Sequence, residues 1–458
     1  MVAGSGAHRR PGADRSAPGP AVVRSGKAPL KLPGMELAAA GATAQDTASR
    51  IHVGRSGINQ WWLLVCDPPA ARTGEADART GEADARTGAR TGAPPGEAAA
   101  RTGAADALLD TARLAAGIDG GPSTVLARAA EAMDRRGDGP GRQAVFVRVE
   151  LDVCGAWCTL SNAGSVRPYV VRRAGWIDVR GHESAPLGEA GPAPADDRAG
   201  LGPGDALVIV PHDRLVAADR AGERFADEAL PEVLLDLVGR PSAEIADAVV
   251  AESSALASDR RRRVLRGGPV VVLRVPGDLG EDPMHRVVRA TGAPPERLHL
   301  PGYPLGDRQP DLWSAPPAPP REARLRLAPT GTRLHEVRAL LRRLLASWRL
   351  DDRVDAGDLE LLATEVTTNA IRHAGTAATV IVRYTGGAVR VEVGDASSAL
   401  PELVPPPPDA EGGRGMPLVE ALASAWGVTP TRHGKRVWFE IGVPDTGRPR
   451  DTEAPEAT

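Results

Sequence analysis

The sequence is poor in aromatic side chains and in cysteine. Aromatic residues make up 3% of the 458 residues, and there are 3 cysteines. An odd and small number of cysteines is typical of a reducing compartment and argues against a disulfide-stabilised scaffold. Cys154 and Cys158 lie in a strand-like stretch without a nearby histidine. We therefore predict buried thiols there rather than ligands of a metal ion.

The sequence also lacks an excess of charge of one sign and lacks long apolar runs. Its formal net charge is -3, which argues against a groove for nucleic acid or a surface for anionic lipids. No apolar run reaches the roughly 18 residues that a membrane-spanning helix needs. The first residues contain no apolar segment of the kind found in secretion signals. We expect a cytoplasmic protein that binds neither membranes nor nucleic acid directly.

Glycine and proline, in contrast, are abundant, with 52 and 42 residues. Residues 1–47 and 446–458 are predicted to be disordered tails. A seven-residue unit, Ala-Arg-Thr-Gly-Glu-Ala-Asp, is repeated within residues 70–103. It has no apolar pair at coiled-coil spacing, so we predict a flexible low-complexity insertion. Pro-Pro and Pro-Gly pairs recur in residues 277–322, which indicates an extended linker.

Periodic apolar residues on both sides of this linker predict two folded domains, residues 48–276 and 323–445. In the first domain, β-type runs predict strands at 61–67, 144–153, 157–162, 169–172, 205–210 and 270–275. Helical spacing predicts helices at 104–116, 123–135, 230–238 and 243–257. In the second domain the same patterns predict strands at 324–327, 379–384, 389–395 and 436–441, and helices at 334–348, 358–373 and 417–426. The expected fold class is α+β.

Three motifs in the second domain form a candidate nucleotide site. Glu365 and Asn369 are four residues apart on a predicted helix and therefore share one face. A carboxylate beside a carboxamide suits a general base next to a magnesium ligand. An apolar strand ends at Asp395. The glycine-rich loop Gly412 to Gly415 precedes a helix, where backbone N–H groups and the helix dipole can hold phosphates.

In this order and spacing, the motifs resemble those of the GHKL ATPases, and within them the anti-sigma-factor serine kinases similar to RsbW and SpoIIAB. Glu-x-x-x-Asn-Ala resembles the N box, and Gly-Asp-Ala-Ser resembles the first glycine box in its anti-sigma form. Gly-Gly-Arg-Gly-Met resembles the second glycine box. The resemblance implies a GHKL α/β sandwich that binds ATP and Mg²⁺.

The resemblance also implies a role for each matching residue. Asn369 would coordinate the Mg²⁺ of ATP, and Asp395 would accept the adenine amino group. Gly413 and Gly415 would let the lid backbone approach the phosphates. Glu365 would orient or deprotonate the attacking serine hydroxyl of a protein substrate. In this family that substrate is a STAS-type anti-sigma-factor antagonist, and the other partner is a sigma factor.

Residues 48–276 resemble a second family, the SpoIIE-like PPM-type serine/threonine phosphatases. The resemblance lies in Leu160-Ser-Asn-Ala-Gly164, in Leu201-Gly-Pro-Gly-Asp205 and in Asp213-Arg-Leu-Val-Ala-Ala. In the last segment Arg214 takes the place of the glycine of the family. The resemblance implies a PPM-like β-sandwich with flanking helices that holds two Mn²⁺ or Mg²⁺ ions, which activate a bridging water.

Of the aspartates that this family uses as metal ligands, the sequence retains Asp67 and Asp213. Gly267 and Gly268 align with the late Asp-Asp pair, and residues 54–60 contain no acid. Two carboxylates provide too few oxygen atoms for two cations that each coordinate about six oxygen ligands. We therefore expect a pseudo-phosphatase.

The leading hypothesis is a regulatory serine kinase of a bacterial partner-switching system, with an inactive phosphatase-like domain. One alternative is an active metal-dependent phosphatase whose GHKL domain senses nucleotide. A second alternative is a non-catalytic scaffold that sequesters its partners. The sequence names neither the sigma factor nor the antagonist, and it leaves the oligomeric state open, a homodimer included.

Overall fold

The computed structural model describes most of both predicted domains. The described residues are 21–22, 30–32, 34–41, 50–55, 60–67, 120–137, 140–152, 155–218, 222, 224–227, 229–258, 268–277, 322–329, 334–400, 415–431 and 434–444. The predicted insertion at 70–103, the helix at 104–116, nearly all of the linker and the tail at 446–458 lie outside these residues. No helix among the described residues is both long and apolar enough to span a membrane.

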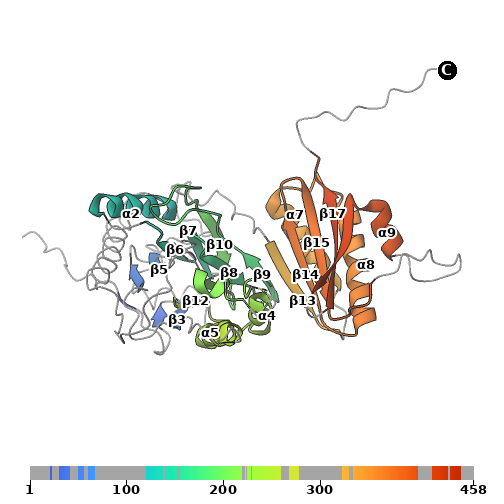
Figure 1. The fold of residues 1–458 in the computed structure, drawn as a ribbon, viewed down its shortest axis with the longest axis horizontal. Helices are drawn as coiled ribbons and strands as arrows, with labels where there is room; N and C mark the ends of the chain where they lie inside the picture. Colours follow the sequence, from blue (N-terminus) through green and yellow to red (C-terminus); the bar gives the residue numbers. More distant parts are fainter. Residues whose placement is uncertain are drawn as a thin grey trace, which may run out of the picture.

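The first domain contains two sheets (Figure 1). One has the order β1 (Ala21–Val22), β4 (Arg50–Arg55), β5 (Gln60–Asp67), β6 (Gln143–Asp152), β7 (Gly155–Ala163) and β10 (Asp197–Leu201). The other contains β9 (Trp176–Val179), β8 (Arg167–Val171), β11 (Ala206–Val210), β12 (Val270–Arg274), β3 (Met35–Ala40) and β2 (Leu30–Leu32). Alternate residues of both sheets meet in one buried apolar cluster, so the two sheets pack face to face as a sandwich.

Helices cover the outer faces of this sandwich. The apolar side of α2 (Pro122–Arg136) packs on β5 and β6, and the helix ends at Gly137, which has a φ of 70°. Helices α3 (His212–Leu215), α4 (Ala229–Asp236) and α5 (Ser242–Ser258) cover the other sheet. The predicted β-sandwich with flanking helices is confirmed.

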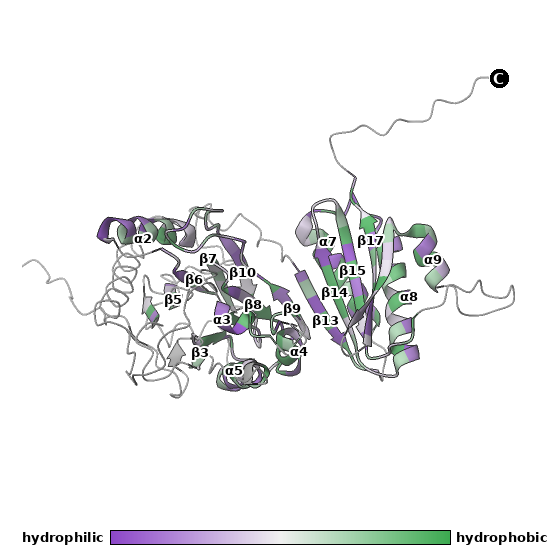
Figure 2. Cartoon of the chain, in the orientation of Figure 1, coloured by the Kyte–Doolittle hydropathy of each residue, from purple (hydrophilic) through white to green (hydrophobic). Residues whose placement is uncertain are grey.

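The second domain is a two-layer α/β sandwich. Its strands are β13 (Glu322–Leu327), β14 (Ala378–Tyr384), β15 (Ala388–Asp395), β16 (Ala425–Thr431) and β17 (Gly434–Gly442). Its helices are α7 (Leu334–Trp348), α8 (Ala356–Ala374) and α9 (Gly415–Leu422). Hydrophobic and hydrophilic residues alternate along the strands (Figure 2), and the apolar face packs against the helices. The predicted α/β sandwich is confirmed.

The two domains share hydrogen bonds between strands. β13 pairs antiparallel with β9, with Ala323 opposite Asp178. The sheet of the second domain therefore continues into the first domain as one eleven-stranded sheet. Nothing in the local pattern of the sequence predicted this pairing, because a strand carries no local signal that identifies a distant partner.

Two predicted boundaries are wrong. The tail predicted to be disordered through residue 47 contains β3, which pairs with β12 and is almost completely buried. Its run of small alanines gives a weak β signal, and its partner is more than half the chain away. The helix predicted over 417–426 ends at Leu422, and residues 425–431 form β16, because Trp426 and Val428 pack on the core beside β17.

Cys158 bears out the prediction of buried thiols. It is fully buried in the sandwich core, and this burial raises the pKa of its thiol to about 12. A thiol with so high a pKa stays protonated at neutral pH. Cys154 lies outside the described residues.

Candidate functional site

Helix α8 carries Glu365 and Asn369 in a fixed orientation. Asp355 caps the helix by accepting hydrogen bonds from the backbone N–H groups of residues 357 and 358, and Gly375 ends it with a φ of 63°. Leu362 and Val366, on the adjoining face of the helix, are buried in the core, whereas Glu365 and Asn369 are half-buried. The helix therefore presents a carboxylate and a carboxamide from the same face.

Gly415, the first residue of α9, lies directly against these two side chains. A Cβ atom at this position would lie 2.9 Å from Asn369 Nδ2 and 3.0 Å from Glu365 Oε2. A larger residue at this position would therefore displace the side chains of Asn369 and Glu365. Three of the predicted site residues, Glu365, Asn369 and Gly415, therefore come together, whereas Gly413 lies outside the described residues.

Asp395 is the last residue of β15 and is buried. Its Oδ1 accepts hydrogen bonds from the backbone N–H of Ser397 at 2.8 Å and from Lys435 Nζ at 3.0 Å. Its Oδ2 is also buried and has no hydrogen-bond partner among the described residues. Because buried polar atoms are rarely left unsatisfied, this oxygen is suited to accept a hydrogen bond from a ligand.

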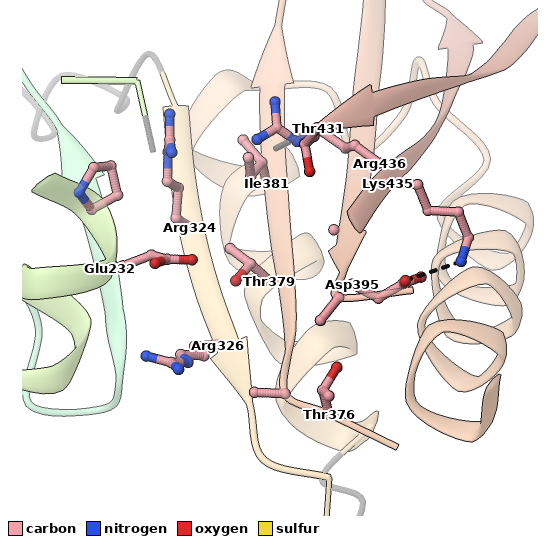
Figure 3. Close-up of a pocket in the computed structure, with 14 residues that line it drawn as sticks. Glu232, Arg324, Arg326, Thr376, Thr379, Ile381, Asp395, Thr431, Lys435 and Arg436 are labelled. Carbon is pink, nitrogen blue, oxygen red and sulfur yellow. Dashed lines mark hydrogen bonds and ion pairs between the residues drawn. The ribbon is translucent and has the colours of Figure 1, made fainter. Parts of the chain in front are cut away.

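A cavity of about 210 Å³ reaches this part of the second domain from the domain junction. Figure 3 shows Asp395 and Lys435 pointing toward each other on one side of it, while Glu232, Arg324 and Arg326 lie on the side of the first domain. The cavity thus gives small ligands and solvent a route to the end of β15.

The described residues fit a magnesium nucleotide. The carboxamide oxygen of Asn369 is a hard ligand of the type that Mg²⁺ prefers. The backbone N–H groups in the first turn of a helix have no partner within the helix, and those of Gly415 and Met416 in α9 therefore suit phosphate oxygens. The unpartnered Oδ2 of Asp395 suits an amino group on a base.

Sequence reasoning did not single out Lys435, although a signal was present. β17 alternates, and Val437 and Phe439 are buried against the helices. The same alternation places Lys435 on that face, where only 5% of its surface is exposed. A lysine on the apolar side of a strand needs an anionic partner, and the register of β15 against β17 places Asp395 directly opposite.

The two predicted metal ligands of the first domain do not form part of a described metal cage. Asp67 ends β5, and Asp213 lies in α3. Within the described ranges there is no group of three or more His, Cys, Asp or Glu residues that could hold a metal ion. The side chain of Asp67 lies outside the described residues.

Arg214 lies in the interior beside Asp213 and is almost completely buried. Its Nε donates to the carbonyl oxygen of Gly268 at 3.0 Å, and its NH1 donates to Ser253 Oγ at 3.0 Å. Its NH2 donates to the carbonyl oxygen of Gly41 at 3.3 Å. One guanidinium group thus joins α3 to α5 and to the ends of β3 and β12, close to Gly268, which aligns with a metal-binding aspartate of the resembled family.

A second group of buried charges lies at the junction of the domains. Asp178 on β9 accepts hydrogen bonds from Arg172 and from Arg343 of α7, and it forms a longer ion pair with Arg180. Burial alone would raise the pKa of Asp178, but these three guanidinium groups hold it below its usual range. Arg343 also stacks over Trp176, 4.7 Å from the ring centre.

Comparison with known proteins assigns both domains. Residues 327–441 match the family described as histidine kinase-like ATPase domain. Residues 96–262 match the family described as stage II sporulation protein E, SpoIIE. No curated protein matches the chain.

Several solved structures are similar to the chain. The RsbU and RsbW domains of Rv1364c from Mycobacterium tuberculosis are 17% identical over 90% of this chain and 94% of that chain, with a TM-score of 0.37. The SiaA-PP2C domain of Pseudomonas aeruginosa is 15% identical over 53% and 79%, with a TM-score of 0.34. The phosphatase domain of SpoIIE from Bacillus subtilis, with a fragment of its regulatory domain, is 14% identical over 53% and 64%, with a TM-score of 0.40. The two family matches thus place a SpoIIE-type phosphatase-family domain ahead of a histidine kinase-like ATPase domain in this chain.

Proposed function

We propose that the protein is an ATP-binding regulatory serine kinase of a partner-switching system. The observation that carries this proposal is the contact of Gly415 with Glu365 and Asn369. It joins a helix N-terminus, a carboxamide and a carboxylate at one place. A phosphoryl-transfer site needs the same groups, namely donors for phosphate, a ligand for Mg²⁺ and a proton acceptor.

Each residue has a distinct part in this proposal. Bound ATP with Mg²⁺ would supply the phosphoryl group. Asn369 would hold the metal ion through its carboxamide oxygen, and Gly415 would keep the backbone of α9 close to the phosphates. Asp395 would accept a hydrogen bond from the base. Glu365 would orient the serine hydroxyl of the protein substrate and take its proton.

The first domain is proposed to be a pseudo-phosphatase that serves as a structural and binding module. The support is the guanidinium of Arg214, which forms hydrogen bonds with Gly268, Ser253 and Gly41. Gly268 aligns with an acidic metal ligand of the resembled phosphatase family. A fixed cation disfavours the binding of a second cation close to it. Asp67 and Asp213 alone provide too few oxygen ligands for two metal ions.

The proposed substrate is a STAS-type anti-sigma-factor antagonist that carries a serine, and the second proposed partner is a sigma factor. The support is the resemblance of the motifs around Glu365, Asn369 and Asp395 to those of the anti-sigma-factor kinases, together with the ATPase-domain match over residues 327–441. A cytoplasmic location is part of the same proposal, since both partners act on transcription.

The test is phosphate transfer from radiolabelled ATP to STAS proteins of the same genome, using the whole chain. We expect labelled serine on one of them, a loss of labelling of about 100-fold or more in Glu365→Gln, and a loss of ATP binding in Asn369→Ala. Arg372→Ala is the matched control, because Arg372 is exposed on the same helix. ATP binding without transfer to any STAS protein would instead support a non-catalytic scaffold.

The phosphatase alternative needs a separate assay. Hydrolysis of an aryl phosphate that depends on Mn²⁺ and is lost in Asp213→Ala would overturn the pseudo-phosphatase proposal. Hydrolysis that is equal in the wild type and in Asp213→Ala would point to a contaminating enzyme. We expect no hydrolysis that depends on Mn²⁺.

A further inference from the structure

Asp395 and Lys435 form a buried cross-strand pair. They are direct neighbours in the register of β15 and β17. Both lie on the face of the sheet that carries Val393 and Val437 and packs against the helices. The exposed fractions of the two side chains in the ion pair are 6% for Lys435 and 1% for Asp395.

The two oxygen atoms of Asp395 differ in their surroundings. Oδ1 accepts from Lys435 Nζ at 3.0 Å and from the backbone N–H of Ser397 at 2.8 Å. Lys435 Nζ also donates to the carbonyl oxygen of Ser397 at 3.2 Å, so it bridges the carboxylate and the turn that follows it. Oδ2 has no partner within the described part of the chain. The lysine therefore fixes the rotation of the carboxylate and leaves one defined oxygen free.

A carboxylate held in this way is a pure acceptor. An ionised carboxylate has no hydrogen to donate. A base with an amino group can donate to Oδ2. A base with a carbonyl oxygen at the same place would put two acceptors against each other in a buried site, which is unfavourable.

We propose that Lys435 is a positioning residue for base recognition. It holds Asp395 so that Oδ2 alone meets the base, and the site thereby selects purine nucleotides with a 6-amino group over those with a 6-oxo group. This inference rests on the proposed nucleotide site. Lys435 does not touch the nucleotide in this proposal, and its whole effect passes through Asp395.

Arg436 provides a matched control next to Lys435 on the same strand. Its guanidinium forms an ion pair with Glu392 at 3.4 Å. Because successive side chains of a strand point to opposite faces, Arg436 points away from the helices and from Asp395. Replacing either cation by methionine removes one positive charge from β17, but only Lys435→Met removes a bond to Asp395.

The experiment measures the affinity of the whole chain for ATP and for inosine triphosphate, which carries a 6-oxo group, by calorimetry with Mg²⁺. We expect the wild type to prefer ATP, and Lys435→Met to reduce this preference about tenfold or more, as expected for a lost hydrogen bond to a charged group. Lys435→Arg should restore part of the preference, and Arg436→Met should leave it unchanged. Lys435→Gln, which is uncharged and one bond too short to keep the hydrogen bond to Oδ1, replaces Lys435→Met if the latter does not fold.

A double-mutant cycle separates positioning from a general structural effect. If Lys435 acts through Asp395, Lys435→Met should change the preference in the wild type but not in an Asp395→Asn background. A wild type that binds neither nucleotide would overturn the proposed function itself. A wild type that binds ATP while Lys435→Met or Lys435→Gln retains the full preference would overturn this inference and leave the proposed function standing.

Discussion

Asp178 Oδ2 and the NH2 group of Arg343 lie 3.2 Å apart, and this ion pair connects the two domains. Asp178 belongs to β9 of the phosphatase-family domain, and Arg343 belongs to α7 of the ATPase domain. α7 in turn packs on α8, where Arg342 binds Glu360 through two hydrogen bonds. A continuous set of contacts thus leads from the domain junction to the helix that carries Glu365 and Asn369.

Replacement of Asp178 by asparagine is expected to destabilise the protein strongly. The substitution removes the carboxylate that the guanidinium groups of Arg172, Arg180 and Arg343 share, and leaves Arg172 with Asp205 and Arg180 with Asp197. The expected loss in the free energy of unfolding is about 3 kcal/mol or more, measured by urea denaturation. Asp236→Asn is the control, because its pair with Arg326 is exposed to solvent, and the loss there should stay below about 1 kcal/mol. Equal losses in the two variants would contradict this account.

The same carboxylate predicts a dependence of stability on pH. The folded protein holds the pKa of Asp178 below its usual range, so its ionised form stabilises the fold above the pKa of the unfolded chain, about 4. The stability gap between wild type and Asp178→Asn should be constant above about pH 5 and shrink as the pH falls through the lowered pKa. Urea denaturation at several pH values measures this gap. A gap that widens on acidification would contradict the predicted sign.

Gly415→Ala tests the contact between α9 and α8. The added methyl group would lie 2.9 Å from Asn369 Nδ2 and 3.0 Å from Glu365 Oε2, so these two side chains must move out of the positions that they hold beside α9. We expect at least about tenfold weaker ATP binding by calorimetry, with little change in thermal stability. At Gly387 an added Cβ meets nothing within 4 Å, and Gly387→Ala should bind ATP as the wild type does. Unchanged binding in Gly415→Ala would argue against phosphate binding at α9.

Arg214→Met tests whether a guanidinium group takes the structural place of metal ions. Removing the side-chain donors leaves the carbonyl oxygens of Gly41 and Gly268 without their bonds to Arg214. We expect a loss of about 2 kcal/mol or more in the free energy of unfolding, with no recovery on addition of Mn²⁺. Arg224→Met, at an exposed position of the same domain, should be close to neutral. Full recovery of stability with Mn²⁺ would show that this region does bind metal.

Local patterns predicted the parts of the site that lie within single elements. Helical spacing placed Glu365 and Asn369 on one face, and the end of an apolar run placed Asp395 at the end of a strand. The partner of Asp395 depends on the register of β15 against β17, which no local window contains. The same applies to β3, whose partner β12 follows more than 200 residues later, and to the bonds of Arg214 with Gly41 and Ser253.

The pairing of β13 with β9 determines which strands can accept a further strand. β13 is hydrogen-bonded on both sides, to β14 and to β9, so it offers no free backbone groups to another chain. Among the described strands, the ends of the long sheet are β16 and β2. β16 contains Pro430, which has no backbone N–H and weakens any added ladder. The fusion of the two domains thereby protects the ATPase domain against edge-to-edge aggregation.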